Sequence, residues 1–166
     1  MQKQIKILST LLTVLILAVS CANTNPNDPT KTKEELLKQK WQDNDTTYGI
    51  SQYHITDNKF DSLYNNSVSY SITIEKIAWN TDNTSGIIYG KYTVNNNNPN
   101  YVGKYYAISF KGLADSKVSI SGASKNIGTT EKPTYDSSAE SLEEAKTKFT
   151  EANGYFDFYS DCTAVE

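Results

Sequence analysis

Apolar and polar residues alternate along the middle of the chain, and this alternation limits the fold more than any other feature. Segment 67–79 carries an apolar side chain at every second position: Val68, Tyr70, Ile72 and Ile74. Segment 105–111 repeats the pattern with Tyr106, Ile108 and Phe110. A period of two residues is typical of a β-strand with one face on a core and the other in water. We therefore expect Val68, Tyr70, Ile72 and Ile74 to face inward.

Turn-forming Asn, Asp and Gly residues separate the alternating runs at short intervals. Consecutive strands without intervening helices form an antiparallel meander. Such a sheet must hide its edges, and a closed or nearly closed small barrel is the simplest solution for a chain of this size, with a small β-sandwich as the alternative. The predicted strands cover residues 47–56, 59–64, 67–79, 86–94, 101–111 and 117–122.

Two capping boxes predict helices on either side of the meander. Thr32 and Glu35 begin a short N-terminal helix that continues through Leu36, Leu37 and Trp41. Ser141 and Glu144 begin a helix over 142–152, with Leu142, Ala145 and Phe149 on one stripe. We expect this helix to cover one end or one open face of the barrel and to protect an edge. The run 155–159 is then the last strand, and the polar segment 123–140 is either disordered or a lid.

This order of elements resembles a lipocalin-like (calycin) barrel. The matching parts are Lys40-Trp41 near the barrel entrance, the meander 47–122 and the helix–strand pair 141–160. Where lipocalins carry Gly-x-Trp, this chain has Gln39-Lys40-Trp41. The resemblance implies one lipocalin-like domain over residues 32–166. It carries over no binding residues, because no binding motif of the family is matched.

The N-terminus resembles a bacterial lipoprotein signal. Lys3 and Lys6 precede an apolar run that ends at Ala18-Val19-Ser20-Cys21. The resemblance implies a signal peptide over 1–20, acylation (for example with palmitate) of Cys21, and a flexible tether over 22–31. The protein would then be anchored by lipid in the bacterial cell envelope, in the outer membrane, on its periplasmic or surface face. Ala18-Val19-Ser20 also fits an ordinary signal peptidase site, which would release a secreted protein.

Cys21 and Cys162 are the two cysteines of the chain. If Cys21 is acylated, Cys162 is a lone thiol; if it is not, the two can pair and join the ends of the chain. A metal site needs several ligands at short spacing, which two distant cysteines do not provide. We expect no metal and no cofactor.

The charge pattern argues against a nucleic-acid partner. The formal net charge is −3, every basic residue is Lys, and no basic cluster occurs. Without Arg, bidentate recognition of phosphate or carboxylate groups is also less expected.

No residue pattern predicts an enzyme. His54 is the only histidine, and no nucleophile motif accompanies it. The sequence Asp43-Asn44-Asp45 echoes a calcium loop, but the twelfth position is His54 where a bidentate Glu is needed. Glu75, Asp157 and Asp161 are not spaced for acid–base work and are expected to be solvated.

Twelve tyrosines make aromatic residues the best functional candidates. If the barrel encloses a cavity, strand aromatics line it and offer stacking surfaces and hydroxyls to a small apolar or aromatic ligand. The alternative is a solid aromatic core, with the domain acting as a protein–protein interaction module (an adhesin, inhibitor or assembly accessory) through loops 95–100 and 123–140. The candidate ligand-binding residues are Tyr53, Tyr70, Tyr89, Tyr92, Tyr106 and Phe158.

Overall fold

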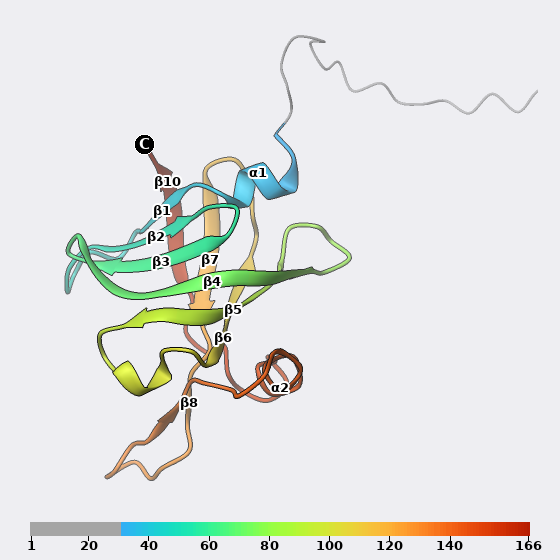
Figure 1. Ribbon diagram of the computed structural model, residues 1–166. Helices are drawn as coiled ribbons and strands as arrows, with labels where there is room; N and C mark the ends of the chain where they lie inside the picture. Colours follow the sequence, from blue (N-terminus) through green and yellow to red (C-terminus); the bar gives the residue numbers. More distant parts are fainter. Residues whose placement is uncertain (1–30) are drawn as a thin grey trace, which may run out of the picture. The chain divides into compact units, whose positions relative to one another are not determined.

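Eight antiparallel strands close into a barrel in residues 31–166, the part of the chain that this computed structural model describes (Figure 1). Seven of them follow one another as a meander, each paired with the next, and the last strand of the chain pairs with both β7 and β1. Closure removes every sheet edge from the barrel. The predicted antiparallel barrel is confirmed. The barrel strands are β1 Lys40–Asp43, β2 Ser51–Ile55, β3 Lys59–Tyr64, β4 Ser67–Trp79, β5 Gly86–Asn95, β6 Tyr105–Lys111, β7 Lys117–Gly122 and β10 Ser160–Val165.

Helix α1 (Lys33–Leu37) lies at the end of the barrel where β1 begins. The predicted capping box is present, with Thr32 accepting from the Glu35 N–H and Glu35 accepting from the Thr32 N–H. The helix ends earlier than predicted, because Trp41 belongs to β1. Its buried indole donates a 3.1 Å hydrogen bond to the carbonyl of buried Leu37, which fastens α1 to the barrel. We call this end the α1 end, and the opposite end the loop end.

Fully buried apolar side chains occupy the interior toward the α1 end. Phe60 pairs across strands with Ile72, and Ile88 with Ile108, so these side chains share the inward face. Phe110 and Ile120 make a further buried pair. This part of the barrel has a packed core.

A β-bulge corrects the prediction for Val68. Ser62 pairs with Tyr70 and Leu63 with Val68, so Ser69 is an extra residue on β4. An extra residue moves everything beyond it to the opposite face. Tyr70, Ile72 and Ile74 therefore face the interior as predicted, whereas Val68 faces outward and is 37% exposed.

Helix α2 (Leu142–Lys148) contacts the outer surface of β5 and β6. Ala145 and Phe149 are fully buried there, as the apolar stripe predicts. The helix protects no edge, because the barrel has none. Helix α2 and the segment after it also cover the face of β6 that the alternation predicted to be in water. Ala107 and Ser109 are therefore buried along with Tyr106 and Ile108, and Ser109 lies 2.8 Å from the Tyr159 hydroxyl.

The closing strand begins five residues later than predicted. The aromatic run 155–159 has no strand structure, and β10 covers 160–165. Tyr155 and Phe156 are nevertheless buried. Segment 123–140 is ordered and contains a two-stranded sheet of β8 (Lys125–Asn126) and β9 (Tyr135–Asp136). A short 3-10 helix, η1 (Pro99–Tyr101), lies in the β5–β6 connection.

Residues 1–30, including the predicted signal peptide, Cys21 and most of the tether, lie outside the described residues. Within 31–166, no helix has the length and apolar character needed to cross a membrane.

Candidate functional site

A small cavity of about 200 Å³ opens at the loop end of the barrel. We call it the tyrosine pocket, because four tyrosines from β4, β5, η1 and β6 form most of its wall. None of the lining residues is charged. They are Tyr70, Tyr92, Asn95, Asn97, Asn98, Tyr101, Tyr106, Ser124 and Ser137.

A second β-bulge shapes this pocket. Ser71 pairs with Val94 and Ile72 with Tyr92, so Thr93 is an extra residue on β5. The extra residue brings Asn95 onto the inward face opposite Tyr70, while Tyr92 stays on that face one step deeper. The Asn95 side chain then accepts hydrogen bonds from the N–H groups of Asn97 (3.1 Å) and Asn98 (2.8 Å), which fold the β5–β6 loop over the pocket mouth.

The tyrosine rings are packed in a defined arrangement. Tyr92 stacks on Tyr106 with ring centroids 4.7 Å apart and, on its other side, lies 6.0 Å from Tyr101 at an interplanar angle of 24°. Tyr70 meets Tyr92 and Tyr106 edge-on, at 81° and 82°. Both geometries are favourable for aromatic pairs. The four rings therefore hold one another at fixed positions in the pocket wall.

The hydroxyls of Tyr70, Tyr92 and Tyr106 stay protonated at ordinary pH. Burial, followed by the neighbouring tyrosines, raises the pKa values of Tyr70 and Tyr106 well above the usual range. Burial raises the pKa of Tyr92 in the same way. The Tyr92 hydroxyl lies 3.5 Å from the Ser137 carbonyl, its acceptor. These groups can donate and accept hydrogen bonds, but they are poor bases and poor nucleophiles.

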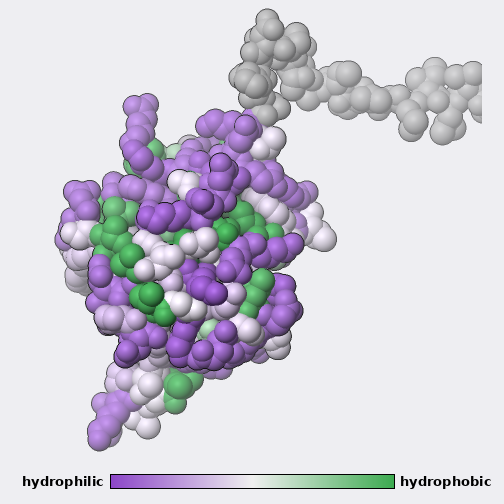
Figure 2. All heavy atoms as spheres, viewed as in Figure 1, coloured by the Kyte–Doolittle hydropathy of each residue, from purple (hydrophilic) through white to green (hydrophobic). Residues whose placement is uncertain are grey.

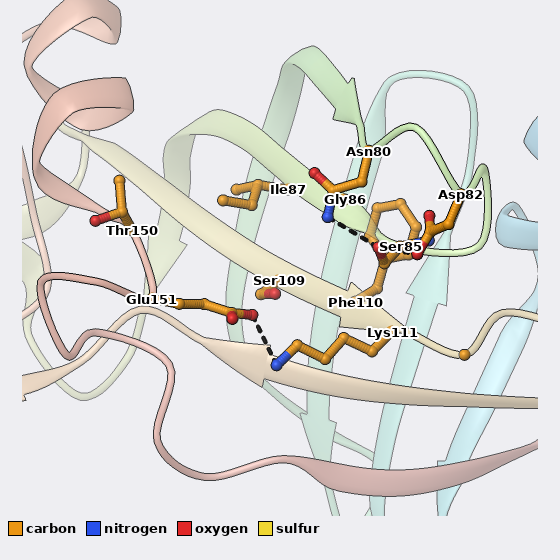
Figure 3. Close-up of a pocket in the computed structure, with 11 residues that line it drawn as sticks. Asn80, Asp82, Ser85, Gly86, Ile87, Ser109, Phe110, Lys111, Thr150 and Glu151 are labelled. Carbon is orange, nitrogen blue, oxygen red and sulfur yellow. Dashed lines mark hydrogen bonds and ion pairs between the residues drawn. The ribbon is translucent and has the colours of Figure 1, made fainter.

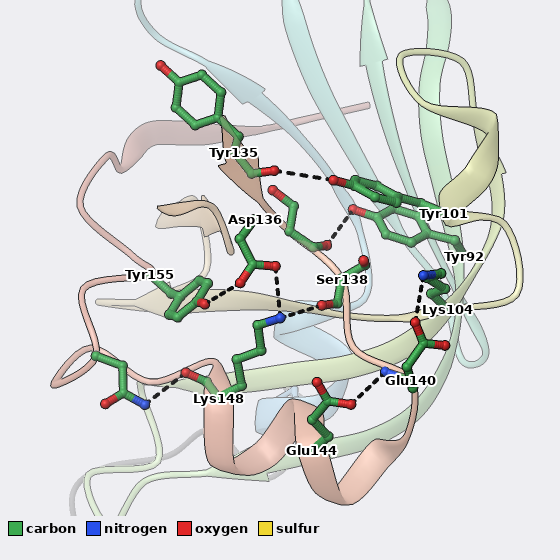
Figure 4. A network of polar contacts seen from close by, with 12 residues as sticks. Tyr92, Tyr101, Lys104, Tyr135, Asp136, Ser138, Glu140, Glu144, Lys148 and Tyr155 are labelled. Carbon is green, nitrogen blue, oxygen red and sulfur yellow. Dashed lines mark hydrogen bonds and ion pairs between the residues drawn. The ribbon is translucent and has the colours of Figure 1, made fainter. Parts of the chain in front are cut away.

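A polar network holds segment 134–140 beside the pocket (Figure 4). Lys148 on α2 forms a 2.8 Å ion pair with Asp136 and donates to the Ser138 carbonyl at 2.7 Å. The Tyr155 hydroxyl donates to the second oxygen of Asp136 at 2.7 Å. On the pocket side, the Tyr101 hydroxyl donates to the carbonyl of Tyr135 at 3.3 Å. Both the helix and the pocket wall thus fix this segment, which contributes Ser137 to the lining.

Three of the six candidate ligand-binding residues meet in the pocket, namely Tyr70, Tyr92 and Tyr106. Tyr53 faces the interior but is separated from Tyr70 by Phe60, with centroid distances of 5.8 and 6.1 Å, and donates to Ser160 at 3.2 Å. Alternation along β5 puts Tyr89 on the outer face opposite Ala107, so it is buried outside the barrel lumen.

Phe158 lies outside any strand, is 90% exposed and does not line the pocket. Tyr101, Ser124 and Ser137 line the pocket but were not among the candidates. Tyr101 belongs to η1, although the predicted strand 101–111 included it. Ser124 and Ser137 lie in segment 123–140, where strand periodicity gives no signal. Asn95, Asn97 and Asn98 belong to loop 95–100, and Ser124 and Ser137 to segment 123–140, the two loops that the sequence offered as interaction surfaces.

A second hollow, of about 450 Å³, lies on the outside of the barrel (Figure 3). Its charged groups are already partnered: Lys111 pairs with Glu151 at 2.7 Å, which raises the pKa of Lys111 and lowers that of Glu151. Across the hollow, Asn80 donates to Ser85 and Ser85 to Asp82, both at 2.8 Å. The charged groups of this outer hollow are therefore engaged within the protein.

The remaining chemical candidates are scattered. His54 pairs across strands with Lys40 and Asp61 on the outer face of β2. Burial, aided by Asp43 and Asp161, raises the pKa of the Cys162 thiol to about 12, so it is a poor nucleophile. Among residues 31–166, no three His, Cys, Asp or Glu side chains gather as metal ligands would.

Comparison with known proteins finds no matching family model, no similar curated protein and no similar solved structure.

Proposed function

We propose that this protein is a non-catalytic binding protein that takes a small ring-bearing ligand into the tyrosine pocket. The observation that carries the proposal is the convergence of four tyrosines on one open, uncharged cavity at the end of an otherwise packed barrel. Binding sites are commonly concave and mostly apolar, with a few placed polar groups. A wall of four tyrosine rings with neutral hydroxyls and amides for orientation meets that description.

The size of the pocket limits the ligand. At about 200 Å³ it is smaller than the 300–1,000 Å³ of typical drug-sized sites. A single aromatic or saturated ring fits, whereas a fatty acid, a retinoid or a haem needs more of the lumen. Phe60, Ile72, Ile88 and Ile108 occupy that deeper space. The proposed ligand therefore enters as one ring, free or at the end of a longer molecule.

The proposed anchor suits this geometry. If Cys21 is acylated, the tether joins the barrel at the α1 end, because the described chain enters the barrel through α1. The pocket opens at the opposite end. An anchored domain would then hold its binding site at the end farther from the point of attachment.

A thermal-shift screen combined with native mass spectrometry tests the proposal. Gently purified protein is examined for a co-purifying small molecule and then screened with phenols, indoles and monosaccharides. A ligand selective for the folded state raises the melting temperature by mass action. Tyr101→Ala should reduce the shift, whereas Phe158→Ala, which removes an exposed aromatic ring outside the pocket, should leave it unchanged. Equal shifts in both variants would contradict binding in the pocket.

A protein–protein interaction module is the second candidate, and one observation favours it. Among residues 31–166, the exposed large apolar side chains belong to connections at the loop end or to the strand ends that border them. On the face shown in Figure 2 the apolar residues form small patches separated by polar ones. Large exposed apolar patches mark protein interfaces, and small scattered ones do not. The pocket is therefore the stronger candidate. The exposed residues are Tyr48, Ile50, Tyr64, Val68, Val94, Val102, Ile127, Tyr135 and Phe158.

A further inference from the structure

Three neighbouring stretches of the loop-end connections contain no charged residue; Asp45 precedes the first of them and Lys104 follows the last. They cover 46–50, 64–69 and 94–103, and consist of Tyr, Asn, Ser, Thr, Gly, Val, Ile and Pro. Tyr, Ser, Gly and Asn are the residues that recognition loops favour, because Tyr gives rigid amphipathic contact area and Ser, Gly and Asn give adaptable hydrogen bonding. The 21% charged content of the whole chain makes this neutral region distinct.

Hydrogen bonds join the three connections into one strip. Ile50 N–H donates to the Asn65 side chain at 2.9 Å, and Asn65 N–H donates to the Ile50 carbonyl at 2.8 Å. The Tyr64 hydroxyl also donates to the Tyr48 carbonyl. Asn96 then bonds back to the β4 side, with its N–H on the Ser69 carbonyl at 2.9 Å and its amide on the Val68 carbonyl at 2.6 Å. We call residues 46–50, 64–69 and 94–103 the neutral strip.

The neutral strip leads directly into the tyrosine pocket. Asn95, Asn97, Asn98 and Tyr101 belong to both. From the β1–β2 loop to β5 the strip crosses β3 and β4, about three strand spacings or roughly 14 Å. A molecule with one ring in the pocket can therefore continue outward along the strip.

Several polar groups on the strip have no partner in the described chain. The side chains of Asn97 and Asn100 are exposed and form no hydrogen bond within residues 31–166. Each carries two amide donors and a carbonyl acceptor. At the far end of the strip, the Tyr48 ring is 87% exposed. Free amides are thus available at the pocket end of the strip, and an exposed ring at its far end.

We propose that the tyrosine pocket and the neutral strip together bind a neutral glycan, with one sugar ring in the pocket and the next residues along the strip. A pyranose has an apolar C–H face that packs on an aromatic ring and a rim of hydroxyls that pair with amides and phenols. Such hydroxyls need no charged partner, and the site offers none. The inference rests on the proposed function, because it assigns the ligand class of the same pocket.

Charge discriminates between glycan classes. An anionic glycan entering the pocket would lose the hydration of its carboxylates or sulfates without meeting Lys or Arg. A neutral glycan has no such penalty. A protein partner would contact mainly the exposed neutral strip, whereas a glycan would also fill the tyrosine pocket. Because the pocket and the strip are continuous, a glycan is favoured over a protein partner.

Isothermal titration calorimetry with the full-length protein tests this assignment. The probes are neutral trisaccharides of glucose, galactose, mannose and N-acetylglucosamine, together with trigalacturonic acid as the charged counterpart and phenol as a bare ring. At least one neutral trisaccharide should bind, at least tenfold more tightly than its monosaccharide, and trigalacturonic acid should not bind.

Matched variants locate the contacts. Asn97→Ala should weaken trisaccharide binding at least fivefold, whereas Asn58→Ala, an exposed Asn in the turn at the α1 end, should not. Tyr48→Ala should weaken the trisaccharide but not the monosaccharide, because Tyr48 lies beyond the pocket. Circular dichroism confirms that each variant is folded.

The outcomes separate the two proposals. If phenol binds in the pocket and no neutral glycan does, the glycan assignment is wrong and the proposed function stands. If neither binds but a protein partner is captured through the loop end, both proposals fail in favour of an interaction module. Binding of the acidic sugar with the same affinity as a neutral one would also overturn the glycan assignment.

Discussion

Tyr70 and Asn95 face each other across β4 and β5 because Thr93 bulges out of β5 between Tyr92 and Val94. In a regular strand without the bulge, Asn95 is three residues after Tyr92 and would point away from the interior. The bulge therefore puts the Asn95 amide on the pocket wall, beside the four tyrosine rings. It also lets Asn95 hold the β5–β6 loop through the N–H groups of Asn97 and Asn98.

The inward face of β4 is tested by a pair of adjacent substitutions. Ile72 is fully buried beside Phe60 and Tyr92, whereas Thr73 is exposed. Ile72→Asp should cost more than about 3 kcal/mol in the free energy of unfolding, because it removes core packing and buries an unpaired charge. Thr73→Asp should cost less than about 1 kcal/mol. Urea unfolding measures both, and equal losses would show that the assigned face is wrong.

Gly122 on β7 leaves room for the hydroxyl of Tyr106. A Cβ built on Gly122 would clash with that oxygen and lie 3.5 Å from the Tyr70 hydroxyl. Gly122→Ala should therefore destabilise the barrel by about 1–3 kcal/mol and displace Tyr106 into the pocket. Removing the hydroxyl with Tyr106→Phe should recover most of that loss in the double variant. A double-mutant cycle in urea measures the coupling, and strict additivity would contradict the contact.

The Asp136–Lys148 pair predicts a pH-dependent stability. Burial alone would raise the pKa of Asp136, but hydrogen bonds from Lys148 and Tyr155 hold it below the ordinary value. A carboxyl with a lowered folded-state pKa stabilises the fold above its unfolded pKa, about 4, and loses that contribution as pH falls through the folded value. Wild type should exceed Asp136→Asn in unfolding free energy at pH 7. The difference should shrink below about pH 4, and a constant difference from pH 2 to 7 would argue against the ion pair.

Cys21 is predicted to be the acylated first residue of the mature protein, on the strength of the charged, apolar and small-residue regions before it. Stable anchoring takes more than one acyl chain, which a lipoprotein cysteine carries. Cys21→Ser should move the domain from the membrane fraction to the soluble fraction. Mass spectrometry of the N-terminus after membrane expression checks the modification directly. An unmodified chain that begins at Cys21 or later would refute it.

The strands of the meander were predictable because their alternation is strong, and β3, β4 and β7 have the predicted bounds. The bulges at Ser69 and Thr93 could not be predicted. Both residues are polar, so the sequence of apolar and polar residues is the same whether or not one of them is an extra residue in the strand. β10 was missed because its inward residues, including Cys162 and Ala164, are small. The aromatic run 155–159 beside it gave a stronger strand signal, yet it packs outside the sheet.

The candidate site was predictable only in part, for a related reason. Tyr70, Tyr92 and Tyr106 were identified because they lie on strands, but alternation could not separate them from Tyr89. Helix α2 buries the outer face of β5, so apolar residues occur on both faces of that strand. An apolar residue on β5 is therefore not necessarily one that faces the barrel interior. Tyr101 and Ser137 come to the pocket through tertiary contacts with Tyr135 and Tyr92, which local sequence does not encode.

Ligand titration followed by NMR of the tyrosine rings tests the central claim most directly. Each ring signal is assigned by a Tyr→Phe variant, and the protein is titrated with the neutral trisaccharide or phenol that gives the largest thermal shift. We predict saturable shifts for Tyr70, Tyr92, Tyr101 and Tyr106, with the signals of Tyr89 and Tyr159 unchanged. Saturable shifts confined to tyrosines outside the pocket, or no shift with any of these probes, would contradict a binding site among these four rings.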